Sequence, residues 1–244
     1  MIGLGTIVNA GAIILGGFLG LFSRKLLSER CQETMIKAMG FATMVMALGS
    51  TLSKMLTVEL AAAGDGYTAS LGTGGEMMMI ISMAAGALLG ELADFERRFE
   101  DLGVWLRDKS GSSGDSEFVN AFMTASLTVC VGAMAVLGSI QDGLNGDHNT
   151  LFAKAVLDLV IVAMMSASLG KGCMFSAVPV ALWQGSITLL SRFIAPIMTD
   201  AALANISYVG NVLIFCVGFN LVFPKTVRVA NLLPALLIAV LFAL

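Results

Sequence analysis

The chain has 244 residues, of which 57% are hydrophobic and 13% charged, and its formal net charge is −3. A soluble domain of this length carries roughly 25% charged residues, so the composition is typical of a membrane protein. The negative charge argues against a nucleic-acid partner, and the four widely spaced cysteines indicate neither a disulfide framework nor a zinc site.

Long apolar runs recur from one end to the other and predict an all-α polytopic membrane protein, with residues 1–244 forming a single transmembrane domain. Most of these runs approach the ~20 residues that a membrane-spanning helix requires. The predicted spans lie near residues 3–22, 38–58, 77–93, 118–140, 151–170, 174–198, 205–223 and 229–244. The last run is short, so seven crossings with a half-buried end is the alternative to eight.

Two connections between the spans have amphipathic patterns. Apolar residues from Leu26 to Met39 alternate with charged ones, and Phe99, Leu102 and Leu106 do the same in the cytoplasmic segment 99–116, which ends in a Ser/Gly linker. Both patterns predict amphipathic helices on the inner membrane surface. The connection 61–75 is rich in Gly, Ala and Thr, which predicts little regular structure.

Small residues recur in a pattern that suggests two-helix repeats. Gly16-x-x-x-Gly20 and Gly86-x-x-x-Gly90 are each followed by two basic residues, an amphipathic segment and a Leu-Gly-Ser sequence. Transporters are often built from such repeats. Gly-x-x-x-Gly faces allow helices to approach closely, either within one chain or between two copies. We therefore expect the protein to form a homo-oligomer, and specifically a dimer.

The distribution of basic residues predicts the orientation. Eleven of the fourteen Lys and Arg residues follow odd-numbered spans. Because basic loops stay in the cytoplasm, this pattern places the N-terminus outside. The eleven are Arg24, Lys25, Arg30, Lys37, Arg97, Arg98, Arg107, Lys109, Lys171, Lys225 and Arg228.

Lys154 and Asp158 are four residues apart in the fifth predicted span and share a helix face. An ionisable side chain at that depth costs on the order of 2.5–3.5 kcal/mol on insertion scales, so such residues often mark ion pathways. One interpretation is a structural pair in which each charge offsets the burial of the other. The alternative is an ion or proton site centred on Asp158.

Further polar groups flank this pair in the sequence. Gln141 and Asp142 close the fourth span and offer oxygen ligands suited to hard cations. Gly138 and Gly143 lie on either side of them and would permit an unwound segment. An exposed interfacial carboxylate is the alternative interpretation of Asp142.

The sixth span carries Gln184-Gly185-Ser186 near its middle, five residues after Pro179. A polar triplet with a glycine suggests a helix break that lines a cavity, with Gln184 and Ser186 facing the solute. A kinked but continuous helix is the alternative.

Several stretches together resemble the YdfK/YqgA-type bacterial membrane proteins, a family of unknown function. The resemblance covers nearly the whole chain and implies a bacterial inner-membrane protein, but it implies no substrate and no binding residues. The stretches are 5–10, 138–143, 150–154 with Asp158, 184–190 and 229–236.

These observations favour a transporter or channel for an ion or small solute, with its site between spans four, five and six. A scaffold or regulator whose inner amphipathic helices bind a partner is the alternative function. Signatures of enzymes such as HExxH, GxSxG and GxxxxGK are absent from the sequence. We therefore expect neither catalysis nor a cofactor.

Overall fold

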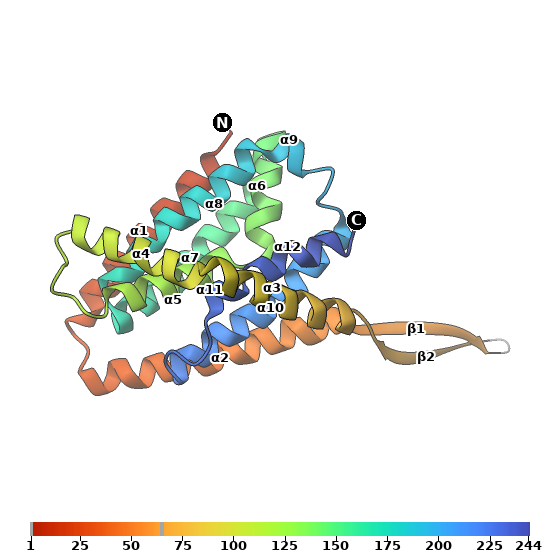
Figure 1. The fold of residues 1–244 in the computed structure, drawn as a ribbon, viewed down its shortest axis with the longest axis horizontal. Coiled ribbons are helices and arrows are strands. Elements are labelled where there is room, and N and C mark those ends of the chain that lie inside the picture. The colour runs from red at the N-terminus through yellow and green to blue at the C-terminus, as the bar shows by residue number, and fades with distance from the viewer. Residues whose placement is uncertain (1, 64–65) are drawn as a thin grey trace.

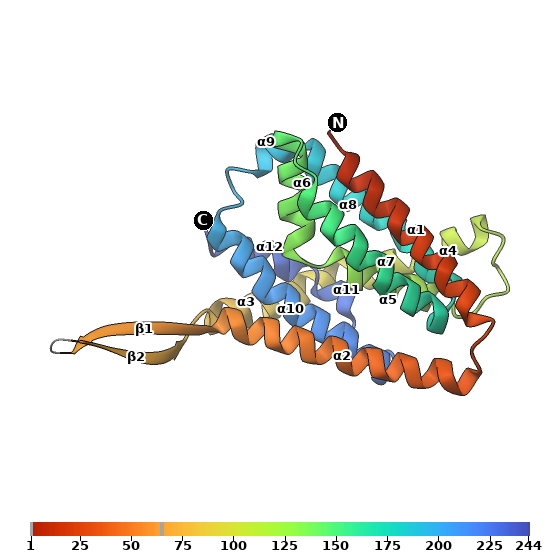
Figure 2. The ribbon, with the colours of Figure 1, turned by 180° about the vertical axis from the view of Figure 1, so that it is seen from behind.

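The computed structural model describes residues 2–63 and 66–244, which form a bundle of helices with one projecting hairpin (Figures 1 and 2). Within the described residues, six helices are long and apolar enough to cross a membrane, and one bent pair makes a seventh crossing. The predicted all-α polytopic fold is confirmed. The six are α1 (Leu4–Arg24), α2 (Glu29–Met55), α3 (Glu76–Ala93), α7 (Asn149–Leu169), η1 with α8 (Lys171–Ser176, Ala177–Leu189) and α10 (Asp200–Val222).

The bent pair consists of α5 (Phe118–Cys130) and α6 (Ala133–Asn145), whose axes differ by 64°. The sequence predicted a single span over 118–140, and the structure corrects it to two helices with a bend between them. Gly132 lies between the two helices with φ 154°, a conformation that side chains other than hydrogen disfavour. This glycine therefore allows the chain to change direction inside the bundle.

The remaining helices are short. They are α4 (Phe95–Lys109), α9 (Ser191–Ile194), α11 (Val229–Leu232) and α12 (Pro234–Leu241). The pair α11 and α12 runs beside α3, because Gly90 faces Asn231 at one end and Met78 packs with Ala239 toward the other. The C-terminal helices thus follow most of the length of a membrane-spanning helix.

Two predictions about the connections change. The amphipathic segment before the second span is not a separate helix, because α2 continues through it for 27 residues, roughly 40 Å. The connection 61–75 contains most of an antiparallel hairpin of β1 (Leu56–Ala63) and β2 (Gly66–Thr73), where little order was predicted. In the register of the two strands, Leu56 lies opposite Thr73 and Ala63 lies opposite Gly66. Residues 64 and 65 lie outside the described residues.

Both Gly-x-x-x-Gly motifs bring helices together within the chain. Gly16 and Gly20 of α1 lie so close to backbone carbonyls of α7 that a Cβ would not fit. Gly86 and Gly90 of α3 face the backbone of α12 and α11 in the same way. The faces on which the predicted dimer was based are therefore occupied inside this chain.

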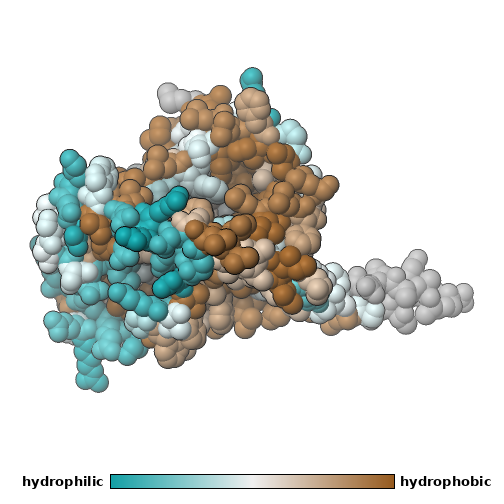
Figure 3. All heavy atoms as spheres, viewed as in Figure 1, coloured by the Kyte–Doolittle hydropathy of each residue, from teal (hydrophilic) through white to brown (hydrophobic). Residues whose placement is uncertain are grey.

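Charged side chains gather at one end of the molecule. Figure 3 shows hydrophilic residues where α4 and residues 110–117 lie and apolar residues over most of the remaining visible surface. The hairpin projects from the opposite end (Figure 1). Between these ends, α1, α5, α7 and α8 share a core in which Ile13, Val162 and Val180 are fully buried. The polar cluster described next lies among these same four helices.

Candidate functional site

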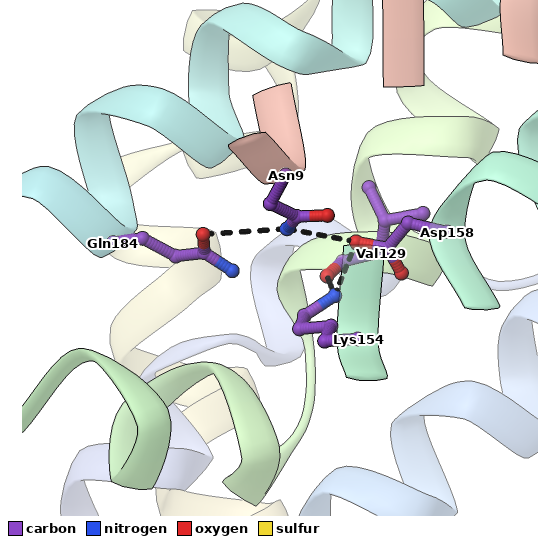
Figure 4. Close-up of polar contacts among 5 residues, drawn as sticks. All are labelled: Asn9, Val129, Lys154, Asp158 and Gln184. Carbon is purple, nitrogen blue, oxygen red and sulfur yellow. Dashed lines mark hydrogen bonds and ion pairs between the residues drawn. The ribbon is translucent and has the colours of Figure 1, made fainter. Parts of the chain in front are cut away.

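A polar cluster lies inside the bundle, where four helices meet (Figure 4). Asn9 comes from α1, Lys154 and Asp158 from α7 and Gln184 from α8, and the backbone carbonyl of Val129 comes from α5. The four side-chain residues are between 0 and 7% exposed. Polar groups buried in this way require hydrogen-bond partners, because burying a polar group without a hydrogen bond costs free energy.

An ion pair forms the centre of the cluster. Lys154 Nζ lies 2.5 Å from Asp158 Oδ2 and donates a 2.8 Å hydrogen bond to the Val129 carbonyl oxygen. Val129 lies in the last turn of α5, where carbonyl groups have no partner within their own helix. The break between α5 and α6 thus supplies an acceptor in the bundle interior. The partial negative charge at a helix C-terminus also favours a cation there.

Two amides extend the cluster toward α1 and α8. Asn9 Nδ2 donates to Asp158 Oδ2 at 3.0 Å and to Gln184 Oε1 at 3.3 Å. Asn9 Oδ1 and Gln184 Nε2 are buried without a hydrogen-bond partner among the described residues. Several other buried polar atoms in the described part of the chain also have no partner, but these two belong to amides that are linked to the ion pair by hydrogen bonds.

Asp142, predicted to join this site, binds elsewhere. Its carboxylate accepts hydrogen bonds from the backbone N–H groups of Gly3 at 3.0 Å and Gly5 at 3.1 Å, and His148 Nδ1 lies 3.0 Å away. A carboxylate in this position caps the N-terminus of α1 and interacts favourably with the helix dipole. Gln141 accepts instead from the Thr150 hydroxyl at 2.7 Å. Both residues therefore connect helix ends outside the cluster.

The two glycines around Asp142 do not unwind the chain, because α6 continues from Ala133 to Asn145. A Cβ at Gly138 would meet the Leu151 side chain, and one at Gly143 would meet the Thr188 carbonyl oxygen. Both glycines therefore allow α6 to pack closely against neighbouring helices. The predicted unwound segment is wrong, and the real break lies at Gly132.

The predicted break around Gln184 is also wrong, because α8 is continuous from Ala177 to Leu189. Gln184 points into the cluster, whereas Ser186 is exposed and donates to the Trp183 carbonyl oxygen at 2.8 Å. These two residues lie on different faces of one helix, and only Gln184 is brought together with Lys154 and Asp158.

A cavity of about 590 Å³ opens near the charged end of the bundle. Glu96, Glu117, Lys225 and Arg228 are among its lining residues, with Asn120, Thr124 and Leu127 of α5. Leu127 precedes Val129 by two residues, or about 3 Å along the helix. The cavity therefore lies along α5 near the axial level of Val129, while Asn9, Val129, Lys154, Asp158 and Gln184 are not among its lining residues.

Sequence reasoning missed Asn9 and the Val129 carbonyl as members of the cluster. Asn9 carries the only amide or charged side chain between Leu4 and Phe22, which distinguishes it from the rest of the first span. No sequence pattern marks the Val129 carbonyl as an acceptor. The Val-Gly-Ala sequence that follows it, at residues 131–133, is ordinary within an apolar run, because glycine is common in membrane helices.

Comparisons with known proteins match the chain along nearly its whole length. The model of a family described as "Protein of unknown function (DUF554)" matches residues 4–244. The "Uncharacterized membrane protein YdfK" of Bacillus subtilis is 27% identical over 234 residues, which cover 96% of this chain and 93% of the relative. The "Uncharacterized protein YqgA" of Escherichia coli is 25% identical over 240 residues, or 97% of this chain and 94% of the relative. No solved structure matches.

Proposed function

The chain belongs to the DUF554 family, and we propose that it is a transporter or channel that carries an ion or small solute across the membrane, past Lys154 and Asp158. The observation that carries this proposal is a buried ion pair held at a broken membrane span. Ionisable side chains inside a bundle and discontinuous helices both recur in transport pathways. The site differs from the predicted one because α1 takes part and the outer end of α6 does not.

The cavity near the charged end supports the same function. Its polar lining would suit a solute entering from one side, and its α5 lining reaches Leu127, two residues before Val129. We propose that this opening faces the cytoplasm and that the solute leaves it chemically unchanged. The charge distribution supports that side, since basic loops remain in the cytoplasm.

The alternative function, a scaffold that binds partners through its inner amphipathic helices, receives less support. The apolar face of α4 packs inside the chain, where Leu106 joins Phe118 and Phe122 and the ring of Phe99 stacks on Phe122 at 5.5 Å. A face used in this way is not free for a partner protein.

Flux into proteoliposomes tests the function. Purified protein is reconstituted, and uptake of a panel of inorganic ions and small solutes is compared between wild type, Asp158→Asn and the double variant Asp158→Asn with Lys154→Met. We expect wild-type flux of at least one solute and its loss in both variants. Wild-type flux in the double variant would show that the pair is structural and would overturn the proposed site. Ser186→Ala, on the exposed face of α8, is the matched control.

We also propose a bacterial inner-membrane location with the N-terminus outside. Single cysteines at Ser113 and Asn149, both exposed, are introduced into a cysteine-free chain. An impermeant maleimide added to intact cells should label Asn149→Cys and not Ser113→Cys, and the opposite pattern would reverse the orientation. We keep the homodimer as a proposal, although both Gly-x-x-x-Gly faces pack within the chain, and a single species of 25.4 kDa in native detergent would remove it.

A further inference from the structure

We infer that the cluster is a binding site for one small monovalent cation, which occupies the position that the Lys154 ammonium holds in this structure. The inference rests on the proposed function and deepens it by naming the class of ion. In this arrangement the lysine side chain and the cation compete for the same oxygen atoms.

The atoms around the ammonium form a set of oxygen ligands. Asp158 Oδ2 and the Val129 carbonyl oxygen already contact Lys154 Nζ. An ammonium group is a compact point charge, so these two oxygens are spaced to hold a small cation. Carboxylate and carbonyl oxygens favour hard cations over the soft metals that thiolates and thioethers select.

The two unpaired amide atoms extend this set. Asn9 Nδ2 contacts Asp158 Oδ2, while Oδ1 of the same amide is buried without a partner among the described residues. The two ends of an amide are nearly equal in size, so a half-turn of the group would direct Oδ1 toward the ion pair. Gln184 Oε1, 3.3 Å from Asn9 Nδ2, would become available by the same turn. A bound cation would thus give both amide oxygens a positively charged partner.

Charge decides between monovalent and divalent cations. Asp158 contributes one negative charge to the cluster, Lys154 offsets it with one positive charge, and Asn9 and Gln184 are neutral. One monovalent cation preserves that balance once the Lys154 side chain has moved out of the cluster with its charge, and in Lys154→Met the cation balances Asp158 directly. A divalent cation would leave excess positive charge inside the bundle, where uncompensated charge is costly. The four-carbon stem of lysine is flexible, which allows the ammonium to withdraw.

Thermal unfolding in detergent tests the site independently of transport. Wild type, Lys154→Met and the double variant Lys154→Met with Asp158→Asn are melted in lithium, sodium or potassium chloride and in choline chloride at matched ionic strength. We expect at least one alkali cation to raise the Tm of Lys154→Met by about 3 °C or more over choline. The wild type should respond less, because the ammonium competes, and the double variant should not respond.

An equal Tm of Lys154→Met in all four salts would overturn the inference. Should that variant not survive purification, Lys154→Gln replaces it, because the glutamine amide can still donate to Val129. Flux of another solute by a protein without a cation response would overturn this inference and leave the proposed function standing. A cation response limited to Lys154→Met, without flux of any solute by the wild type, would support the site and overturn transport.

Discussion

Two buried carboxylates in the same bundle have different kinds of partners. Asp142, in the last turn of α6, is bound mainly by the backbone N–H groups of Gly3 and Gly5, with the His148 ring beside it. Asp158, within α7, is bound by the side chains of Lys154 and Asn9. The two acids are 0% and 3% exposed, so burial does not distinguish them.

The mobility of the partners does distinguish them. The N–H groups around Asp142 belong to the first turn of α1, and they cannot leave the carboxylate unless that helix end unfolds. Lys154 and Asn9 can rotate away from Asp158 while their helices stay intact, and further polar atoms lie unpaired beside them. A buried carboxylate held mainly by backbone N–H groups is therefore fixed in place, whereas one held by flexible side chains can exchange partners.

The largest effects on stability are expected at the ion pair. Lys154→Met or Asp158→Asn alone leaves one buried charge without its partner, which should lower the free energy of unfolding by about 3–5 kcal/mol. The double variant removes both charges and should lose less than either single variant. Denaturation in detergent with choline as the added cation measures all three. Losses that simply add would show that the two side chains are not coupled.

The next effect is expected at the cap of α1. Asp142→Asn keeps one acceptor oxygen but leaves Gly3 or Gly5 with an unpaired N–H group, so the free energy of unfolding should fall by about 1–3 kcal/mol. Any Tm response to alkali cations should stay at its wild-type size, because this carboxylate does not belong to the cluster. Asp101→Asn, on an exposed position of α4, is the control. A lost cation response would place Asp142 in the pathway after all.

The contrast between the two acids also explains how far the sequence could be interpreted. Lys154 and Asp158 were identifiable because charges in a long apolar run carry a cost that hydropathy reveals. The membrane spans were identifiable because long apolar runs also stand out in hydropathy. Both features depend on the composition of one segment, without reference to its neighbours.

The remaining features depend on segments far apart in the chain. Asp142 is 137 residues from Gly5, whose N–H it accepts, and Asn9 is 149 residues from Asp158. Such pairings follow from how helices pack, and no local pattern encodes them. The break at Gly132 was missed because glycine is common in membrane helices, whereas the more polar stretches at Gly138 and Gly185 proved helical.

A third carboxylate, Glu96 at the start of α4, extends the comparison to the charged end. Its Oε2 accepts from the Ala230 backbone N–H at 3.0 Å, and burial raises its pKa above the ordinary 4.5. A raised pKa means that the folded state binds the proton more tightly, so stability falls as pH rises from 4.5 through the folded pKa. Glu96→Gln should remove this fall. Its Tm relative to wild type should therefore increase between about pH 4 and pH 8.

Glu100→Gln is the matched control for that measurement, because Glu100 lines the same cavity and is exposed. Its difference from wild type should change less with pH than that of Glu96→Gln. A relative Tm of Glu96→Gln that decreased with pH would contradict the sign of the shift.

The smallest effect on stability is expected at Gln184. Gln184 accepts one 3.3 Å hydrogen bond from Asn9, and its Nε2 is unpaired. Met has a similar length and no buried donor, so Gln184→Met should change the free energy of unfolding by less than about 1 kcal/mol.

The same substitution tests whether Gln184 is a cation ligand. If Gln184 only fills space, the Lys154→Met response to alkali cations should persist in Lys154→Met with Gln184→Met. Because we assign its Oε1 to the cation, we expect the added change to shrink that response, while Ser186→Ala on the same helix leaves it intact. A response of full size in the Gln184→Met background would remove the α8 amide from the site and restrict the ligands to α1, α5 and α7.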